Sequence, residues 1–147
     1  MKCPRSRIVR VERRFLRLIA QVDLSTIDCP TFVVGAVTDH LTPWKCCYQS
    51  RGYLGGKNTT FALSNGGHVA ALVNPPGNPK AYHWIAPAIA ETGDEWLDSS
   101  AKLPGSWWES WAKWCGERSG DLVPAPRKLG SKQHPATIDA PGDYVVS

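Results

Sequence analysis

Phe32-Val33-Val34-Gly35-Ala36-Val37 is an apolar run that ends two residues before Asp39. A second run, TTFALS at residues 59–64, ends before the loop Asn65-Gly66-Gly67-His68. Apolar runs of this length are typical of buried strands in a parallel sheet with both faces covered. Ligands and catalytic groups gather at the carboxyl ends of such strands. We therefore predict that Asp39 and His68 lie together at one edge of a sheet.

The segment between the two runs has the features of a crossover helix. Pro43 suits the first turn of a helix, which we expect over about residues 43–54. Gly55-Gly56 would end this helix in the left-handed conformation. A strand, a helix and a second strand in this order form a right-handed parallel crossover. The pattern predicts an α/β fold with parallel strands and crossover helices.

An aspartate followed by a histidine, both at strand ends, is the later part of an α/β-hydrolase triad. In a triad the histidine takes the proton of the nucleophile, and the carboxylate orients the histidine. Taken singly, Asp39 also suits a turn or helix N-cap, and His68 an ordinary loop histidine. The two interpretations remain open on the residues alone.

The nucleophile elbow, G-x-S-x-G or G-x-C-x-G, does not occur in the 147 residues. Loss of the nucleophile lowers the turnover of a triad enzyme by about 10⁶-fold. We therefore expect Asp39 and His68 to be nearly inert without a nucleophile from elsewhere.

Composition excludes two classes of protein. The mean hydropathy is −0.28, and no apolar stretch approaches the roughly 18 residues of a membrane span. Residues 1–22 hold seven of the 17 basic residues and one of the 13 acidic ones. The remaining residues therefore hold ten basic and twelve acidic ones, so a nucleic-acid interface would depend on the basic segment alone. We predict neither a membrane span nor a nucleic-acid partner.

Five cysteines are present, an odd number without C-x-x-C spacing: Cys3, Cys29, Cys46, Cys47 and Cys115. This usage indicates a reducing cytoplasm more than a disulfide framework. A zinc site would need about four suitably spaced ligands, and His40, His68 and the cysteine pair lack such spacing. We predict no metal site and no cofactor.

Tryptophan is frequent in the second half of the chain, at positions 84, 96, 107, 108, 111 and 114. Ser106 and Glu109 have the spacing of a capping box, which predicts a helix that begins at Trp107. Trp107, Trp111 and Trp114 would share one face of this helix. We therefore expect a Trp-rich helical tail after the sheet.

Several of these motifs together resemble the carboxyl-terminal part of polyhydroxyalkanoate synthases. The resemblance runs from about Val22 to the end of the chain and is carried by CPTFVV (29–34), TDHLTPW (38–44), LSNGGH (63–68), VNPPGNPK (73–80), PGSWW (104–108) and APGDYV (140–145). It implies the carboxyl-terminal portion of an α/β-hydrolase fold at residues 22–147. It also implies an acyltransferase that polymerises (R)-3-hydroxyacyl-CoA into polyester and releases CoA. The CoA thioester is the substrate, so the resemblance implies no cofactor.

The resemblance assigns catalytic roles to two residues. His68 matches the histidine that activates the cysteine nucleophile, and Asp39 matches the aspartate thought to help activate the 3-hydroxyl group. The cysteine would lie upstream, so we expect this chain to be a fragment that is inactive alone. The implied partners are the acyl-CoA substrate, the polyester granule, and either a second copy or an amino-terminal half, at a cytoplasmic or granule-surface location.

Three points remain open. Residues 1–21 depart from the family pattern and are a remnant of the substrate cap, a divergent start or an out-of-frame translation. One alternative to the synthase is a fragment of a lipase-type or thioesterase-type hydrolase. The other is a non-catalytic module that binds granules or the intact synthase through Trp107, Trp111 and Trp114.

Overall fold

The computed structural model describes residues 23–145. The chain divides into two units, Met1–Glu117 and Arg118–Ser147. Within the described part of the first unit, four strands form one sheet in the order β1-β2-β3-β4. The strands are β1 (Thr31–Ala36), β2 (Thr59–Ser64), β3 (Tyr82–Pro87) and β4 (Ala101–Pro104). The helices are α1 (Trp44–Gln49), α2 (His68–Leu72), α3 (Gly93–Ser99) and α4 (Trp107–Gly116), with short 3-10 helices at Leu24–Thr26, Ser50–Tyr53 and Asp143–Val145.

The first two strands form the predicted parallel pair, with Val33 opposite Phe61. The connection between them runs through α1 and the 3-10 helix at Ser50–Tyr53. Six α-helical and four 3-10 residues together span about 17 Å, close to the length of a six-residue strand. The connection therefore returns the chain to the edge of the sheet where β1 began.

The other two strands, which the sequence analysis did not predict, are antiparallel to their neighbours, so parallel pairing is limited to β1 and β2. The five residues of α2 span only about 8 Å, whereas β2 is about 20 Å long. Because α2 cannot carry the chain back along the sheet, β3 begins near the edge where β2 ends. The fold is α/β with a mixed four-stranded sheet.

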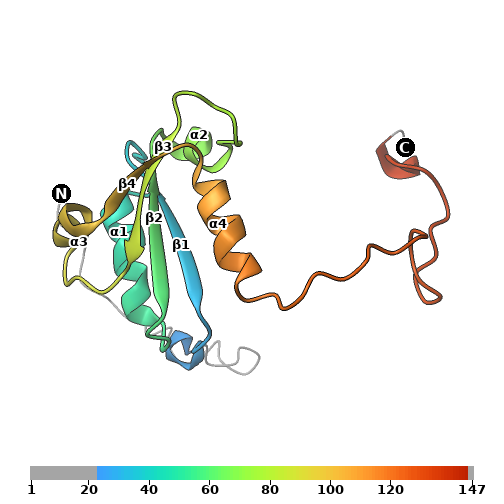
Figure 1. Cartoon of the computed structure of the whole chain (residues 1–147), viewed down its shortest axis with the longest axis horizontal. Coiled ribbons are helices and arrows are strands. Elements are labelled where there is room, and N and C mark those ends of the chain that lie inside the picture. Colours follow the sequence, from blue (N-terminus) through green and yellow to red (C-terminus); the bar gives the residue numbers. More distant parts are fainter. Residues whose placement is uncertain (1–22, 146–147) are drawn as a thin grey trace, which may run out of the picture. The chain divides into compact units, whose positions relative to one another are not determined.

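One face of the sheet is covered by α1 and α3 (Figure 1). Phe61 of β2 packs edge-on against Tyr48 and Trp96, with ring centroids 5.3 and 4.8 Å apart. Trp96 and Tyr48 are fully buried. This aromatic cluster, completed by Leu63 and Ala88, is the hydrophobic core of the first unit.

The opposite face of the sheet is covered by α4 (Figure 1). Phe32 of β1 stacks on Trp107 with ring centroids 6.4 Å apart, and Trp114 meets Phe32 edge-on at 5.6 Å. The predicted helix at Trp107 is therefore present, but it belongs to the same unit as the sheet. A separate Trp-rich helical tail is not confirmed, because Trp84 lies on β3 and Trp96 lies in the core on α3.

Two local predictions are corrected by the structure. The complete capping box lies at α3, where Thr92 and Glu95 each accept from the other's backbone N–H. At α4, Ser106 accepts from the Trp108 amide, and no reciprocal bond from Glu109 is present in the cap. Neither Gly55 nor Gly56 adopts positive φ, so the predicted left-handed helix end is wrong. The role of Gly55 is steric, because a Cβ there would lie 1.8 Å from the carbonyl oxygen of Ser25.

The second unit, described over residues 118–145, has little regular structure. It contains one isolated β-bridge between Gly130 and Pro135 and the 3-10 helix at Asp143–Val145. Nearly all of its described residues are exposed. The predicted division at residues 21 and 22 lies outside the described residues and stays a prediction. Over residues 23–145, no helix is long and apolar enough to cross a membrane.

Candidate active site

Asp39 lies in the loop that follows β1, and its carboxylate organises that loop. Oδ1 accepts from the backbone N–H groups of Leu41 and Thr42 at 2.9 and 3.0 Å. Oδ2 accepts from the hydroxyl of Thr42 at 2.6 Å. The side chain is only 5% exposed. Asp39 therefore does act as a turn residue, which was one of the two interpretations of the sequence. The same hydrogen bonds fix the position of Oδ2.

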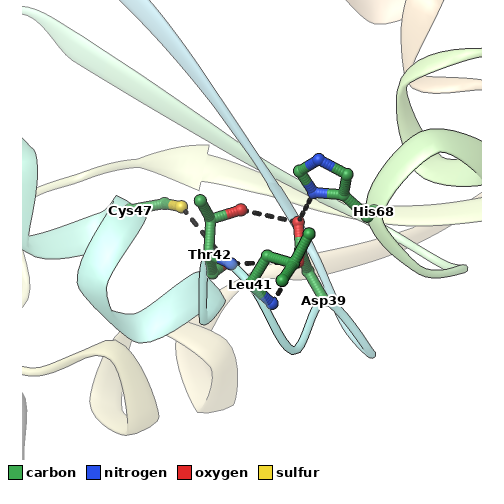
Figure 2. A network of polar contacts seen from close by, with 5 residues as sticks. All are labelled: Asp39, Leu41, Thr42, Cys47 and His68. Atoms are coloured by element: carbon green, nitrogen blue, oxygen red, sulfur yellow. Dashed lines mark hydrogen bonds and ion pairs between the residues drawn. The ribbon is translucent and has the colours of Figure 1, made fainter.

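His68 is the first residue of α2, directly after the loop that ends β2. Gly66 in this loop has φ of +103°, a conformation that residues with a Cβ rarely adopt. The turn brings the His68 imidazole over the loop after β1, where Nδ1 lies 2.8 Å from Oδ2 of Asp39 (Figure 2). The structure thus brings together the two residues that the sequence placed at neighbouring strand ends.

The ionisation of Asp39 fixes which tautomer neutral His68 adopts. The hydroxyl of Thr42 is the largest cause that lowers the pKa of Asp39 far below its ordinary value, and the Thr42 amide, His68 and the Leu41 amide add to it. Asp39 is therefore ionised at neutral pH. An ionised carboxylate only accepts hydrogen bonds, so neutral His68 donates Nδ1–H to it and keeps the lone pair on Nε2.

The second imidazole nitrogen is available for chemistry. The His68 side chain is 44% exposed, and no residue among 23–145 forms a hydrogen bond with Nε2. A general base needs a lone pair within hydrogen-bond reach of the proton that it takes. The pair therefore has the geometry of the base and its orienting carboxylate in a triad.

The cysteines nearest to Asp39 in the sequence, Cys46 and Cys47, lie on α1. The thiol of Cys47 lies 3.6 Å from the backbone carbonyl of Thr42 and donates to it. Figure 2 shows Thr42 between this thiol and the imidazole of His68. The nucleophile elbow is absent from the sequence, so the site consists of an oriented histidine without an assigned nucleophile.

A polar network around the loop that precedes His68 was missed by the sequence analysis. Asn65 accepts from the Tyr82 amide and donates to the carbonyl of Lys80, both at 3.0 Å. Asn74 is buried and donates to the hydroxyl of Ser64 at 3.4 Å. The network links the loop before His68 to the segment that enters β3. The asparagines stand within the LSNGGH and VNPPGNPK motifs, which were the available signal.

A metal centre has no support from the described residues. Over residues 23–145, no three His, Cys, Asp or Glu side chains are grouped to hold a metal ion. The prediction that the protein uses no cofactor is not tested by this observation and stays a prediction.

Comparison with known proteins identifies relatives of the chain. It is 40% identical over 124 residues to poly(3-hydroxyalkanoate) polymerase 1 of Ectopseudomonas oleovorans. This aligned stretch covers 84% of this chain and 22% of the relative. It is 39% identical over 126 residues to polymerase 2 of the same organism. The chain is homologous to part of the poly(3-hydroxyalkanoate) polymerases. The polymerase subunit PhaC of Cupriavidus necator is a further relative, 38% identical over 124 residues.

These matches confirm the resemblance on which the sequence analysis relied. They extend over 84–86% of the chain, which spans only about a fifth of the length of each polymerase. No protein-family model matches the chain. The alternative of a lipase-type or thioesterase-type fragment gains no support, since the relatives found are named as polymerases.

Proposed function

We propose that this chain carries the histidine base and its aspartate for a polyhydroxyalkanoate polymerase, an acyltransferase that acts on (R)-3-hydroxyacyl-CoA. The observation that carries the proposal is the 2.8 Å hydrogen bond between Asp39 and His68 Nδ1, with no hydrogen bond to Nε2 from the described residues. The identity to the polymerases supports the assignment of this pair to polymerase chemistry.

In the proposed reaction, His68 Nε2 takes the proton of a cysteine thiol that lies outside these 147 residues. The thiolate attacks the thioester carbonyl, the bond from the acyl carbon to the CoA sulfur breaks, and Nε2 passes its proton to that sulfur, so that CoA leaves as its thiol. The 3-hydroxyl of another hydroxyacyl unit then attacks the acyl-cysteine while Nε2 takes its proton. A new ester bond forms as the bond between the acyl carbon and the cysteine sulfur breaks, and Nε2 passes its proton to that sulfur, which restores the thiol.

The contacts of Asp39 favour an indirect role of this residue in the proposed reaction. Both carboxylate oxygens already accept hydrogen bonds, and the side chain is nearly inaccessible. The lowered pKa of Asp39 also makes it a weak base toward an alcohol. Asp39 would therefore act through His68, by fixing the imidazole tautomer and stabilising its protonated form, and would not contact the 3-hydroxyl itself.

The missing nucleophile predicts that the chain alone releases no CoA. Turnover needs a polypeptide that supplies the cysteine, and the acyl-CoA and the growing polyester are the proposed partners. The proposed location is the cytoplasm, at the granule surface when polymer is present.

The non-catalytic granule-binding alternative is less well supported. Of the three tryptophans invoked for it, Trp107 and Trp114 are half-buried against Phe32, and Trp111 is the exposed one, at 46%. These tryptophans therefore serve chiefly to hold α4 on the sheet.

A chimera tests the proposed function. The aligned stretch of E. oleovorans polymerase 1 is replaced by residues 22–147 of this chain, and CoA release from (R)-3-hydroxyacyl-CoA is measured with a thiol reagent. We expect turnover in the chimera and its loss in His68→Gln, with Asp39→Asn strongly impaired. Equal turnover in the His68→Gln chimera would exclude His68 as the base.

A further inference from the structure

The helix that carries His68 is too short to be stable by itself. The first turn of a helix is costly to form, and isolated helices below about 12 residues are marginal in water. With five residues, α2 leaves most of its carbonyl groups without partners inside the helix. The backbone carbonyl of Val69 accepts a hydrogen bond from the amide of Val73 at 2.9 Å. Other groups must therefore hold the carboxyl end of α2.

Two neighbouring tryptophans at the start of α4 supply these groups. The indole Nε1–H of Trp107 donates to the carbonyl of Ala71 at 2.7 Å. The indole Nε1–H of Trp108 donates to the carbonyl of Leu72 at 2.9 Å. The donors thus cap consecutive carbonyls of α2 from a segment 36 residues away in the sequence.

The preceding residue extends the same contact. The hydroxyl of Ser106 donates to the carbonyl of Asn74, just beyond α2. Ser106 also accepts from the amide of Trp108 and so forms the N-cap of α4. One tripeptide therefore begins α4 and closes α2.

The tryptophan pair is itself fixed to the sheet. Trp107 stacks on Phe32, in the strand that leads to Asp39. Ser110, one turn further along α4, lies 2.8 Å from Nε2 of buried His83 on β3. Trp107 thus contacts both the strand that precedes Asp39 and the helix that begins with His68.

We propose that Trp107 and Trp108 are positioning residues for His68. Their indole N–H groups hold the carboxyl end of α2, and this keeps the imidazole Nδ1 against Asp39 at the other end of the helix. The catalytic meaning of this arrangement rests on the proposed function, whereas the arrangement itself is tested without turnover.

The test uses the full chain and the variants Trp107→Phe and Trp108→Phe, which lose the N–H group and keep an aromatic ring. Trp111→Phe on the same helix is the matched control, because over residues 23–145 the indole of Trp111 makes no hydrogen bond to α2, and phenylalanine keeps an aromatic ring beside Trp107, whose ring centroid lies 6.4 Å from that of Trp111. Long-range ¹H–¹⁵N spectra report the tautomer of His68, assigned with His68→Gln. Amide hydrogen exchange of Val73 reports the stability of α2, and near-UV circular dichroism reports folding.

We expect each hydrogen-bond variant to lower the exchange protection of Val73 by about fivefold, the effect of one lost hydrogen bond of about 1 kcal/mol. We also expect a smaller fraction of the Nδ1–H tautomer of His68, with Trp111→Phe unchanged in both respects. Wild-type values in folded Trp107→Phe and Trp108→Phe would overturn the proposal. If Trp107→Phe does not fold, Trp108→Phe decides, since its hydrogen bond is the more exposed of the two.

Failure here differs from failure of the proposed function. A His68 tautomer that does not respond to the tryptophans overturns the positioning role and leaves the chimera result untouched. A chimera that works without His68 overturns the catalytic role and leaves the spectroscopic result untouched.

Discussion

Thr42 donates its hydroxyl to Oδ2 of Asp39 at 2.6 Å, and the same oxygen accepts from His68. The threonine thus holds one side of the carboxylate while the imidazole occupies the other. Its backbone amide binds the remaining oxygen. This single residue is the main reason why the pKa of Asp39 is far below its ordinary value.

Replacing this hydroxyl should raise the pKa of Asp39. In Thr42→Val the charged carboxylate loses its shortest hydrogen bond, so its pKa moves up toward the ordinary value of about 3.9. Thr42→Ser keeps a hydroxyl and should titrate near the wild type. The measurement is the pH dependence of the Asp39 carboxyl ¹³C shift. Identical titrations of the valine and serine variants would contradict the assigned cause.

The charge of Asp39 should stabilise the fold in a defined pH range. The native pKa is depressed, so the contribution is present above the unfolded pKa of about 3.9 and is lost as pH falls through the lower native pKa. Urea unfolding of wild type and Asp39→Asn from pH 7 to pH 3 measures it. We expect the advantage of the wild type to be constant above about pH 5 and to shrink toward pH 3. A constant difference over the whole series would show that ionisation is not involved.

Phe61 should be among the most sensitive positions of the core. It is 1% exposed and packs against both Tyr48 and Trp96. Phe61→Ala removes these contacts and leaves a cavity, so we expect a loss of about 3–5 kcal/mol in the free energy of unfolding. Leu122→Ala, at a fully exposed position, should change it by less than about 0.5 kcal/mol. Denaturant titrations compare the two, and a similar cost for both would refute the placement of the core.

A pair of glycine variants tests the close packing of the loop after the Ser50–Tyr53 helix. A Cβ at Gly55 would lie 1.8 Å from the carbonyl oxygen of Ser25, so Gly55→Ala must displace backbone and should lower the melting temperature. Gly116 ends α4 with open space around it. Gly116→Ala should therefore stabilise the chain by about 0.4–1 kcal/mol through the unfolded state. Thermal unfolding that ranks the two variants in the opposite order would argue against this loop geometry.

The successful sequence predictions rest on local patterns. The apolar runs ending before Asp39 and Asn65 identified β1 and β2, because a buried strand needs apolar side chains along its length. Their parallel pairing followed from the helix between them, which is long enough to return the chain. The closeness of Asp39 and His68 followed in turn. The chemical role of the pair came from the resemblance and from triad logic, and it remains a proposal.

The unsuccessful predictions concern relations between distant segments. The antiparallel direction of β3 depends on the short length of α2, and no strand was predicted at Tyr82–Pro87 whose direction could be inferred. The spacing of Ser106 and Glu109 is compatible with a capping box, yet the side chain of Glu109 does not complete it. Thr92 and Glu95 have the same spacing and do form one.

The sequence by itself determined that β1 and β2 form and which side chains follow them, because the apolar run of a buried strand and the turn after it are local patterns. Only the tertiary structure decided what holds His68 in place. The hydroxyl of Thr42 acts through the carboxylate of Asp39, and the indoles of Trp107 and Trp108 act on the far end of α2. Hydrogen bonds between segments that are 36 residues apart depend on the packing of α4 against the sheet, and no local pattern encodes them.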